Sequence, residues 1–147
     1  LVRAAAGPET RVVRVTDAGR FDIMPLLVTS DGAIAALGID HRRLRPNLVI
    51  GGVDGLAERD WEGRFLRIGA AVIGLADLRG RCVMTTFDPD TGAQDVGVLK
   101  RIRSEFAGTF ALNAWVAKHG RIAVGDPVAL LDTFEGADPP RLGRFAK

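Results

Sequence analysis

The sequence has 147 residues, the length of a single domain that can bury a sizeable hydrophobic core. It carries 20 Lys and Arg against 18 Asp and Glu, and its arginines are scattered without the basic run typical of nucleic-acid-binding proteins, so we predict no nucleic-acid partner. One cysteine, two histidines and no apolar stretch of membrane-spanning length exclude a disulfide framework and a Cys/His zinc site, and they favour a cytoplasmic protein with no membrane partner.

The first predicted elements are two strands and a short helix. Residues 11–15 alternate apolar and basic side chains, and residues 25–29 are mostly branched and apolar, so each stretch predicts a strand. Ser30 or Asp31 is a typical N-cap for a helix that runs through Leu37.

Polar residues stand beside two of the predicted strands. For Thr29 and Ser30, helix capping is the simpler explanation and ligand contact is the alternative. Arg45 and Asn47 stand at the entrance of the next predicted strand, residues 48–50, where a forked donor and an amide can face one ligand. Arginine suits bidentate recognition of phosphate or carboxylate, but a solvated basic loop whose asparagine closes its own turn is the alternative.

The second half of the chain predicts more strands and one helix. Apolar residues at helical spacing over residues 96–106 predict a helix with one face in the core. The predicted strands are two within residues 61–78 that Gly69 separates, then residues 82–87, 109–116, 121–124 and 128–131, of which 109–116 and 121–124 form a hairpin. About seven or eight short strands against two helices predict a mainly β fold, either a barrel or a compact sandwich.

Cys82 is the most distinctive chemical group, because it is the only thiol and Arg81 lies beside it. It begins the predicted strand 82–87, and residues 88–92 (Asp-Pro-Asp-Thr-Gly) predict a tight turn after that strand. An adjacent guanidinium favours the thiolate, which binds soft metals and attacks electrophiles. The alternative is a buried cysteine that only fills space in the core.

Three segments, in this order, resemble the MOSC domain, the C-terminal domain of molybdenum cofactor sulfurases that also occurs in amidoxime-reducing molybdenum enzymes. They are residues 45–50 (Arg-Pro-Asn-Leu-Val-Ile), 81–92 (from Arg-Cys-Val-Met-Thr-Thr to Asp-Pro-Asp-Thr-Gly) and 124–128 (Val-Gly-Asp-Pro-Val). The resemblance implies a MOSC-type β-barrel with a few short helices. The expected organisation is a lead-in with one strand at residues 1–22, the MOSC domain at residues 23–132 and a flexible tail at residues 133–147.

The resemblance also implies a molybdenum-pterin cofactor. Cys82 stands at the position of the family's cysteine, which either coordinates molybdenum or carries sulfur as a persulfide. The residues that match cofactor contacts of the family, or a segment that lines the same pocket, are Arg45, Asn47, Arg81, Thr29 and Ser30. Arg79 and Gly80 depart from the pattern, because metal-binding relatives often carry a cysteine and a serine there.

Two functions follow from the resemblance. The first is reduction of N-hydroxylated compounds at molybdenum, with electrons from a separate donor protein, since the sequence has no flavin, haem or iron-sulfur motif. The second is a sulfur-carrier or cofactor-handling module that is loaded by a sulfur-donor protein and has no turnover of its own. A degenerate domain used for protein contact is a third possibility. Pyridoxal phosphate is not implied, because none of the three lysines suggests a Schiff base.

Overall fold

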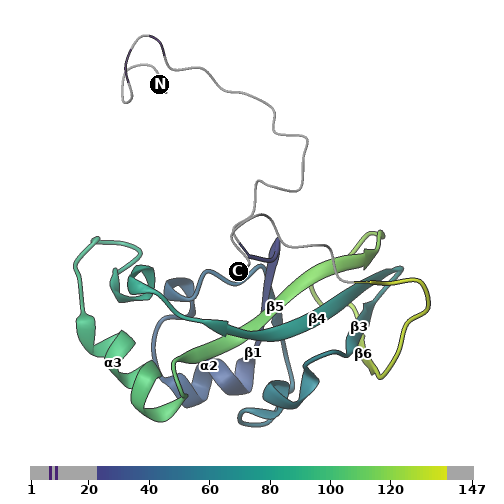
Figure 1. Cartoon of the computed structure of the whole chain (residues 1–147), viewed down its shortest axis with the longest axis horizontal. Helices are drawn as coiled ribbons and strands as arrows, with labels where there is room; N and C mark the ends of the chain where they lie inside the picture. Colours follow the sequence, from purple (N-terminus) through teal and green to yellow (C-terminus); the bar gives the residue numbers. More distant parts are fainter. Residues whose placement is uncertain (1–6, 8, 10–22, 139–147) are drawn as a thin grey trace.

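The computed structural model describes residues 7, 9 and 23–138, and within them the fold is mainly β (Figure 1). Six strands form one sheet that curls into a half-barrel, accompanied by two α-helices and short 3-10 helices. The expected mainly β, barrel-type fold is therefore confirmed, with an open rather than a closed barrel. The strand predicted at residues 11–15 lies outside the described residues. No helix of the described part is long and apolar enough to cross a bilayer.

The order of the strands across the sheet is β2-β1-β5-β4-β3-β6, so β2 and β6 form its two edges. Only β1 and β2 pair in parallel, and the other neighbours are antiparallel. The strands are β1 (Leu26–Ser30), β2 (Leu48–Ile50), β3 (Phe65–Ile68), β4 (Ala71–Gly80), β5 (Thr109–Lys118) and β6 (Val128–Leu131).

Two α-helices cover one side of the sheet. The helices are α2 (Asp31–Leu37) and α3 (Val96–Glu105). Their apolar residues Leu37 and Ile102 pack with Leu27 of β1 and Phe110 of β5. Successive side chains of a strand point to opposite faces, so the neighbouring Val28 belongs instead to the cluster inside the curl of the sheet. β1 is thus covered on both faces.

The segment after Cys82 is not the predicted strand. Residues Val83–Thr86 form a 3-10 helix, η4, with Cys82 at its N-cap. The hydroxyl of Thr85 donates to the carbonyl oxygen of Cys82 (2.9 Å), and that of Thr86 donates to the carbonyl oxygen of Val83 (2.7 Å). Such local hydrogen bonds compete with a strand ladder, so here they override the β propensity of valine and threonine.

The predicted hairpin is only half present. The first strand is confirmed as β5, which pairs with β1 and β4, but residues 121–124 form no strand and belong to a loop. The carboxylate of Asp126 accepts a hydrogen bond from the backbone N–H of Ala123 (2.8 Å), and the backbone N–H of Asp126 donates to the carbonyl oxygen of Ala123 (3.2 Å). This tight turn satisfies backbone groups that a strand would otherwise pair.

Candidate functional site

Cys82 lies where the chain leaves β4 and begins η4 (Val83–Thr86), and its side chain is exposed. The interpretation of this cysteine as core filling is therefore wrong. Arg81, beside it, is half-buried and connects two parts of the chain: its backbone N–H donates to the carbonyl oxygen of Gly108 (3.0 Å), and its Nη2 donates to that of Leu44 (2.6 Å). The thiol thus stands at the surface beside a guanidinium that the fold holds in place.

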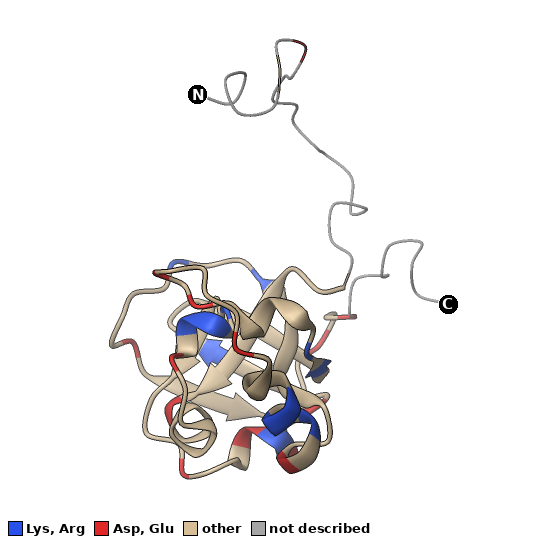
Figure 2. Ribbon diagram, turned by 90° about the vertical axis from the view of Figure 1, so that its left-hand side faces the viewer, with Lys and Arg blue, Asp and Glu red and all other residues tan. Residues whose placement is uncertain are grey.

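Positive charge gathers around Arg81. Burial, helped by the positive charges of Arg79 and Arg45 and opposed by the negative charge of Cys82, lowers the pKa of Arg81 to about 10. The Nε atom of Arg81 is buried and has no hydrogen-bond partner among the described residues. Buried guanidinium nitrogens normally have acceptors, so this donor is left unsatisfied within the described part of the chain. Elsewhere, basic and acidic residues are interspersed over the surface (Figure 2).

Arg42 and Arg43 have structural partners, unlike Arg45. Arg42 forms ion pairs with Asp40 (2.6 Å) and Asp90 (2.7 Å), and Arg43 forms one with Asp88 (2.9 Å). These pairs tie the 3-10 helix η2 (His41–Arg43) to the loop after η4. By contrast, the Arg45 guanidinium makes no hydrogen bond to another described residue.

The backbone at Arg45 is unusual. Its φ is +57°, a left-handed conformation that is rare for residues other than glycine, asparagine and aspartate. The strain of such a conformation persists only where surrounding structure imposes it, and it concentrates at functional sites. Because its side chain is exposed and without a partner in the described part, Arg45 is free to meet a ligand.

The turn predicted at residues 88–92 is confirmed. One carboxylate oxygen of Asp88 accepts hydrogen bonds from the backbone N–H groups of Asp90 (3.1 Å) and Thr91 (2.9 Å), and Gly92 has a φ of +71°. These backbone hydrogen bonds, led by that of Thr91, lower the pKa of Asp88, which stays charged for its pair with Arg43. The turn therefore anchors the segment that carries Cys82.

Asn47 joins β1 to β2 (Leu48–Ile50). Its side-chain oxygen accepts a hydrogen bond from the backbone N–H of Leu27 (2.8 Å), and its own backbone N–H donates to the carbonyl oxygen of Leu27 (2.9 Å). The side chain thus bridges two strands and does not close its own turn. Its Nδ2 group makes no hydrogen bond to another described residue, so it can still donate to a ligand.

Thr29 and Ser30 are both fully buried, but their hydroxyl groups differ. The Ser30 hydroxyl oxygen accepts from the backbone N–H of Ala33 (3.1 Å), which confirms Ser30 as the N-cap of α2, and it donates to the Glu58 carboxylate (2.9 Å). The Thr29 hydroxyl has no partner among the described residues. Ser30 is therefore already engaged, whereas the Thr29 hydroxyl is unpaired within the described part but closed to a surface ligand, because its oxygen is buried.

Glu58 makes the stability of the fold depend on pH. Burial raises the pKa of this carboxyl group above its ordinary 4.5, and the hydrogen bond from Ser30 only partly opposes the shift. The folded state then binds more protons than the unfolded state, so the free energy of unfolding falls as pH rises from 4.5 through the raised value. We expect Glu58→Gln to weaken this dependence in urea titrations between about pH 4 and 8. An equal loss in the exposed control Glu105→Gln would contradict the assignment.

Three polar residues of β4 and β5 form a network that the sequence analysis did not predict. Asn113 of β5 is only 2% exposed, and its side-chain oxygen accepts a hydrogen bond from Nη1 of Arg79 (3.0 Å). Its Nδ2 donates to the Asp77 carboxylate (2.9 Å). Two signals were available: a polar residue in an otherwise apolar strand, and an arginine two positions before Arg81, which places both on one face of an extended chain.

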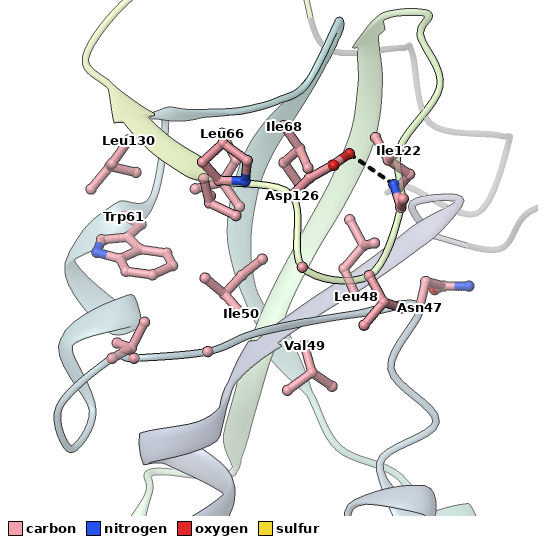
Figure 3. Close-up of a pocket in the computed structure, with 18 residues that line it drawn as sticks. Asn47, Leu48, Val49, Ile50, Trp61, Leu66, Ile68, Ile122, Asp126 and Leu130 are labelled. Carbon is pink, nitrogen blue, oxygen red and sulfur yellow. Dashed lines mark hydrogen bonds between the residues drawn. The ribbon is translucent and has the colours of Figure 1, made fainter.

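The hollow shown in Figure 3 lies elsewhere in the molecule. It has a volume of about 940 Å³, and it lies between the two edge strands β2 and β6 and the loop that contains Asp126. Its walls are mainly apolar, with Trp61 and Leu66 among them. Of the predicted site residues, Asn47 alone lines it. The chemistry around Cys82 is thus a surface site, separate from this hollow.

Comparison with known proteins identifies similar sequences. A family model described as the MOSC domain matches residues 28–129. Mitochondrial amidoxime reducing component 2 of Homo sapiens is 31% identical over 126 residues, which cover 73% of this chain and 37% of that protein. Mitochondrial amidoxime-reducing component 1 of Homo sapiens is 34% identical over 133 residues, covering 75% and 38%. The chain therefore spans well under half the length of these curated relatives.

Proposed function

The chain belongs to the MOSC domain family, and we propose that it binds a molybdenum-pterin cofactor through the Cys82 thiolate. In this proposal it is the molybdenum-binding part of a reductase of N-hydroxylated compounds, as the names of its relatives suggest. The observation that carries the proposal is the exposed thiol beside Arg81, whose buried Nε has no partner in the described part.

The residues around Cys82 fit such a cofactor chemically. A thiolate is a soft ligand of the kind that molybdenum accepts, and nearby positive charge favours the thiolate over the thiol. The cofactor also carries an anionic phosphate, for which Arg45 and Arg81 supply guanidinium donors. Asn47 lines the separate hollow and Thr29 is fully buried, so the proposal gives neither residue a direct contact with the cofactor at Cys82.

Each residue then has a distinct role. When bound, the cofactor would supply the centre for a two-electron reduction. Arg81 is held by the carbonyl oxygen of Leu44, so its positive charge keeps a fixed position next to Cys82 in the chain. Arg45 approaches from the surface, where its exposed side chain can close over a ligand after the ligand has bound. A separate protein would deliver the electrons.

A sulfur-carrier or cofactor-handling module is the alternative, and the exposure of Cys82 favours it equally. The Cys82 thiolate would attack the outer sulfur of a persulfide on a donor protein. A new S–S bond then forms on Cys82, the old one breaks, and the donor thiolate leaves. The positive charge nearby would stabilise the resulting persulfide anion.

The two functions differ in what the purified protein contains. We expect the chain, purified from a host that makes the cofactor, to carry molybdenum and pterin in equal amounts by elemental analysis and fluorescence. An intact mass that shows one added sulfur atom on Cys82, in protein without pterin, would instead support the sulfur-carrier function. Absence of metal, pterin and added sulfur would overturn both.

A further inference from the structure

The hollow between β2 and β6 has no role in the function proposed above, although apolar side chains that are open to water gather around it (Figure 3). Four large aliphatic residues that line it are each at least 39% exposed: Val49, Ile122, Val124 and Val128. Apolar surface in contact with water is unfavourable, so a concentration of it in a concave place marks a binding site.

The hollow has the size and the chemistry of a small-molecule site. Its volume of about 940 Å³ lies within the range of about 300 to 1,000 Å³ that is usual for ligand pockets. Such pockets have mainly apolar and aromatic walls with a few polar groups, and they occur at the mouths of β-barrels. Figure 3 shows the side chains of Trp61, Ile50 and Leu66 directed toward the same space.

A small molecule fits this hollow better than an added strand of polypeptide does. β2 has three residues and β6 has four, and edge strands this short offer few backbone groups to a further strand. Leu48 of β2 and Ile122 of the loop before β6 line both this hollow and a smaller one of about 310 Å³. The loop therefore lies against the beginning of β2 and closes the hollow there.

Asp126 is the one charged residue among the described residues that line the hollow. Its Oδ2 accepts a hydrogen bond from the backbone N–H of Ala123 (2.8 Å), which fixes the carboxylate in its turn. Within the described part of the chain, its Oδ1 makes no hydrogen bond and no cation pairs with it. A half-buried carboxylate at an apolar wall attracts a cation more strongly than a carboxylate in open water does.

We propose that this hollow binds an apolar molecule that carries a cationic group, with the cation beside Asp126 and the apolar body against Trp61 and Leu66. An ammonium group can donate a hydrogen bond to the free Oδ1 of Asp126, whereas an anion would be repelled by it. The apolar body removes the exposed aliphatic surface from water. The hollow is separate from Cys82, so this inference goes beyond the proposed function and needs no cofactor.

The test uses three probes that share one apolar body: 4-phenylbutylamine is a cation at neutral pH, 4-phenylbutanol is neutral and 4-phenylbutyrate is an anion. Trp61 lines the hollow and Trp115 belongs to another cluster, so the fluorescence of Trp61 reports binding and Trp61→Phe should abolish the signal. At low salt, we expect the amine to bind about fivefold to tenfold more tightly than the alcohol, because opposite charges attract at contact. The carboxylate probe should bind most weakly.

Asp126→Asn removes the charge but keeps an oxygen that can accept the hydrogen bond from Ala123. We expect this variant to bind the amine and the alcohol equally, with the affinity for the alcohol unchanged. Asp132→Asn is the matched control, because Asp132 is an exposed carboxylate just after β6 that pairs with Arg64 and does not line the hollow. The control should keep the preference for the amine.

A wild type that binds amine and alcohol equally, or a preference that survives in Asp126→Asn, would overturn the assignment of a cationic ligand. Failure of all three probes to bind would overturn the site itself. A dimer that forms with rising concentration in sedimentation, together with that failure, would show that a second copy covers the hollow. Slow exchange of the outer-edge amides of β2 and β6 in a monomer that binds no probe would show that a segment of polypeptide covers it.

Discussion

Cys82→Ala is expected to remove molybdenum from the purified protein and to abolish reduction of amidoximes. Even the loss of a group that only hydrogen-bonds to a metal ligand costs metal sites about 10- to 100-fold in affinity, so loss of the thiolate itself should cost more than about 100-fold. No group of three His, Cys, Asp or Glu side chains in the described part of the chain could hold a metal instead. Elemental analysis of wild-type and variant protein from the same host measures the effect.

Because Cys82 is exposed, its removal should change metal binding without changing the stability of the fold. Removing an exposed side chain leaves no cavity in the core, so the variant should unfold at the same urea concentration as the wild type. Met84→Ala is the control, because it also removes an exposed sulfur-containing side chain from the same segment. Equal molybdenum in wild type and Cys82→Ala would show that the cysteine is not the ligand. Cys82→Ser should behave like the alanine variant, since a hydroxyl is a much harder donor than a thiolate.

Ser30→Ala should have the largest effect on stability, about 2 to 4 kcal/mol. Loss of the helix N-cap costs about 0.5 to 2 kcal/mol, and the Glu58 carboxylate left without its buried donor costs about 1 to 3 kcal/mol more. Both groups are at most 1% exposed, so water cannot replace the lost hydrogen bonds. Urea titration monitored by the fluorescence of the two tryptophans measures the change.

The same variant separates two roles for Ser30. Ser104→Ala, which removes an exposed hydroxyl from α3, is the control and should change stability by less than about 0.5 kcal/mol. If Ser30 acts through α2 and Glu58, the folded variant retains its molybdenum at low temperature. Wild-type stability combined with a loss of molybdenum would instead indicate direct contact of Ser30 with the cofactor.

Local chemistry explains which features could be predicted from the sequence. Three features depend on residues within a few positions of one another, so they could be predicted from the sequence. They are the cap at Ser30, the turn around Asp88 and the break at Gly69. The strand predicted after Cys82 does not form, because the hydroxyl groups of Thr85 and Thr86 make local hydrogen bonds that compete with strand pairing. Composition indicates a propensity there, but not which hydrogen bonds form.

The sequence by itself determined the mainly β character and most of the strands, and it singled out Cys82 beside Arg81 as the candidate site. Only the tertiary structure decided that the thiol is exposed, that Ser30 is engaged by Glu58, and that Asn113 orients Arg79. These contacts join residues 28 to 34 positions apart. They depend on strand register and burial, which arise when distant segments pack together and are not encoded in any one stretch of residues.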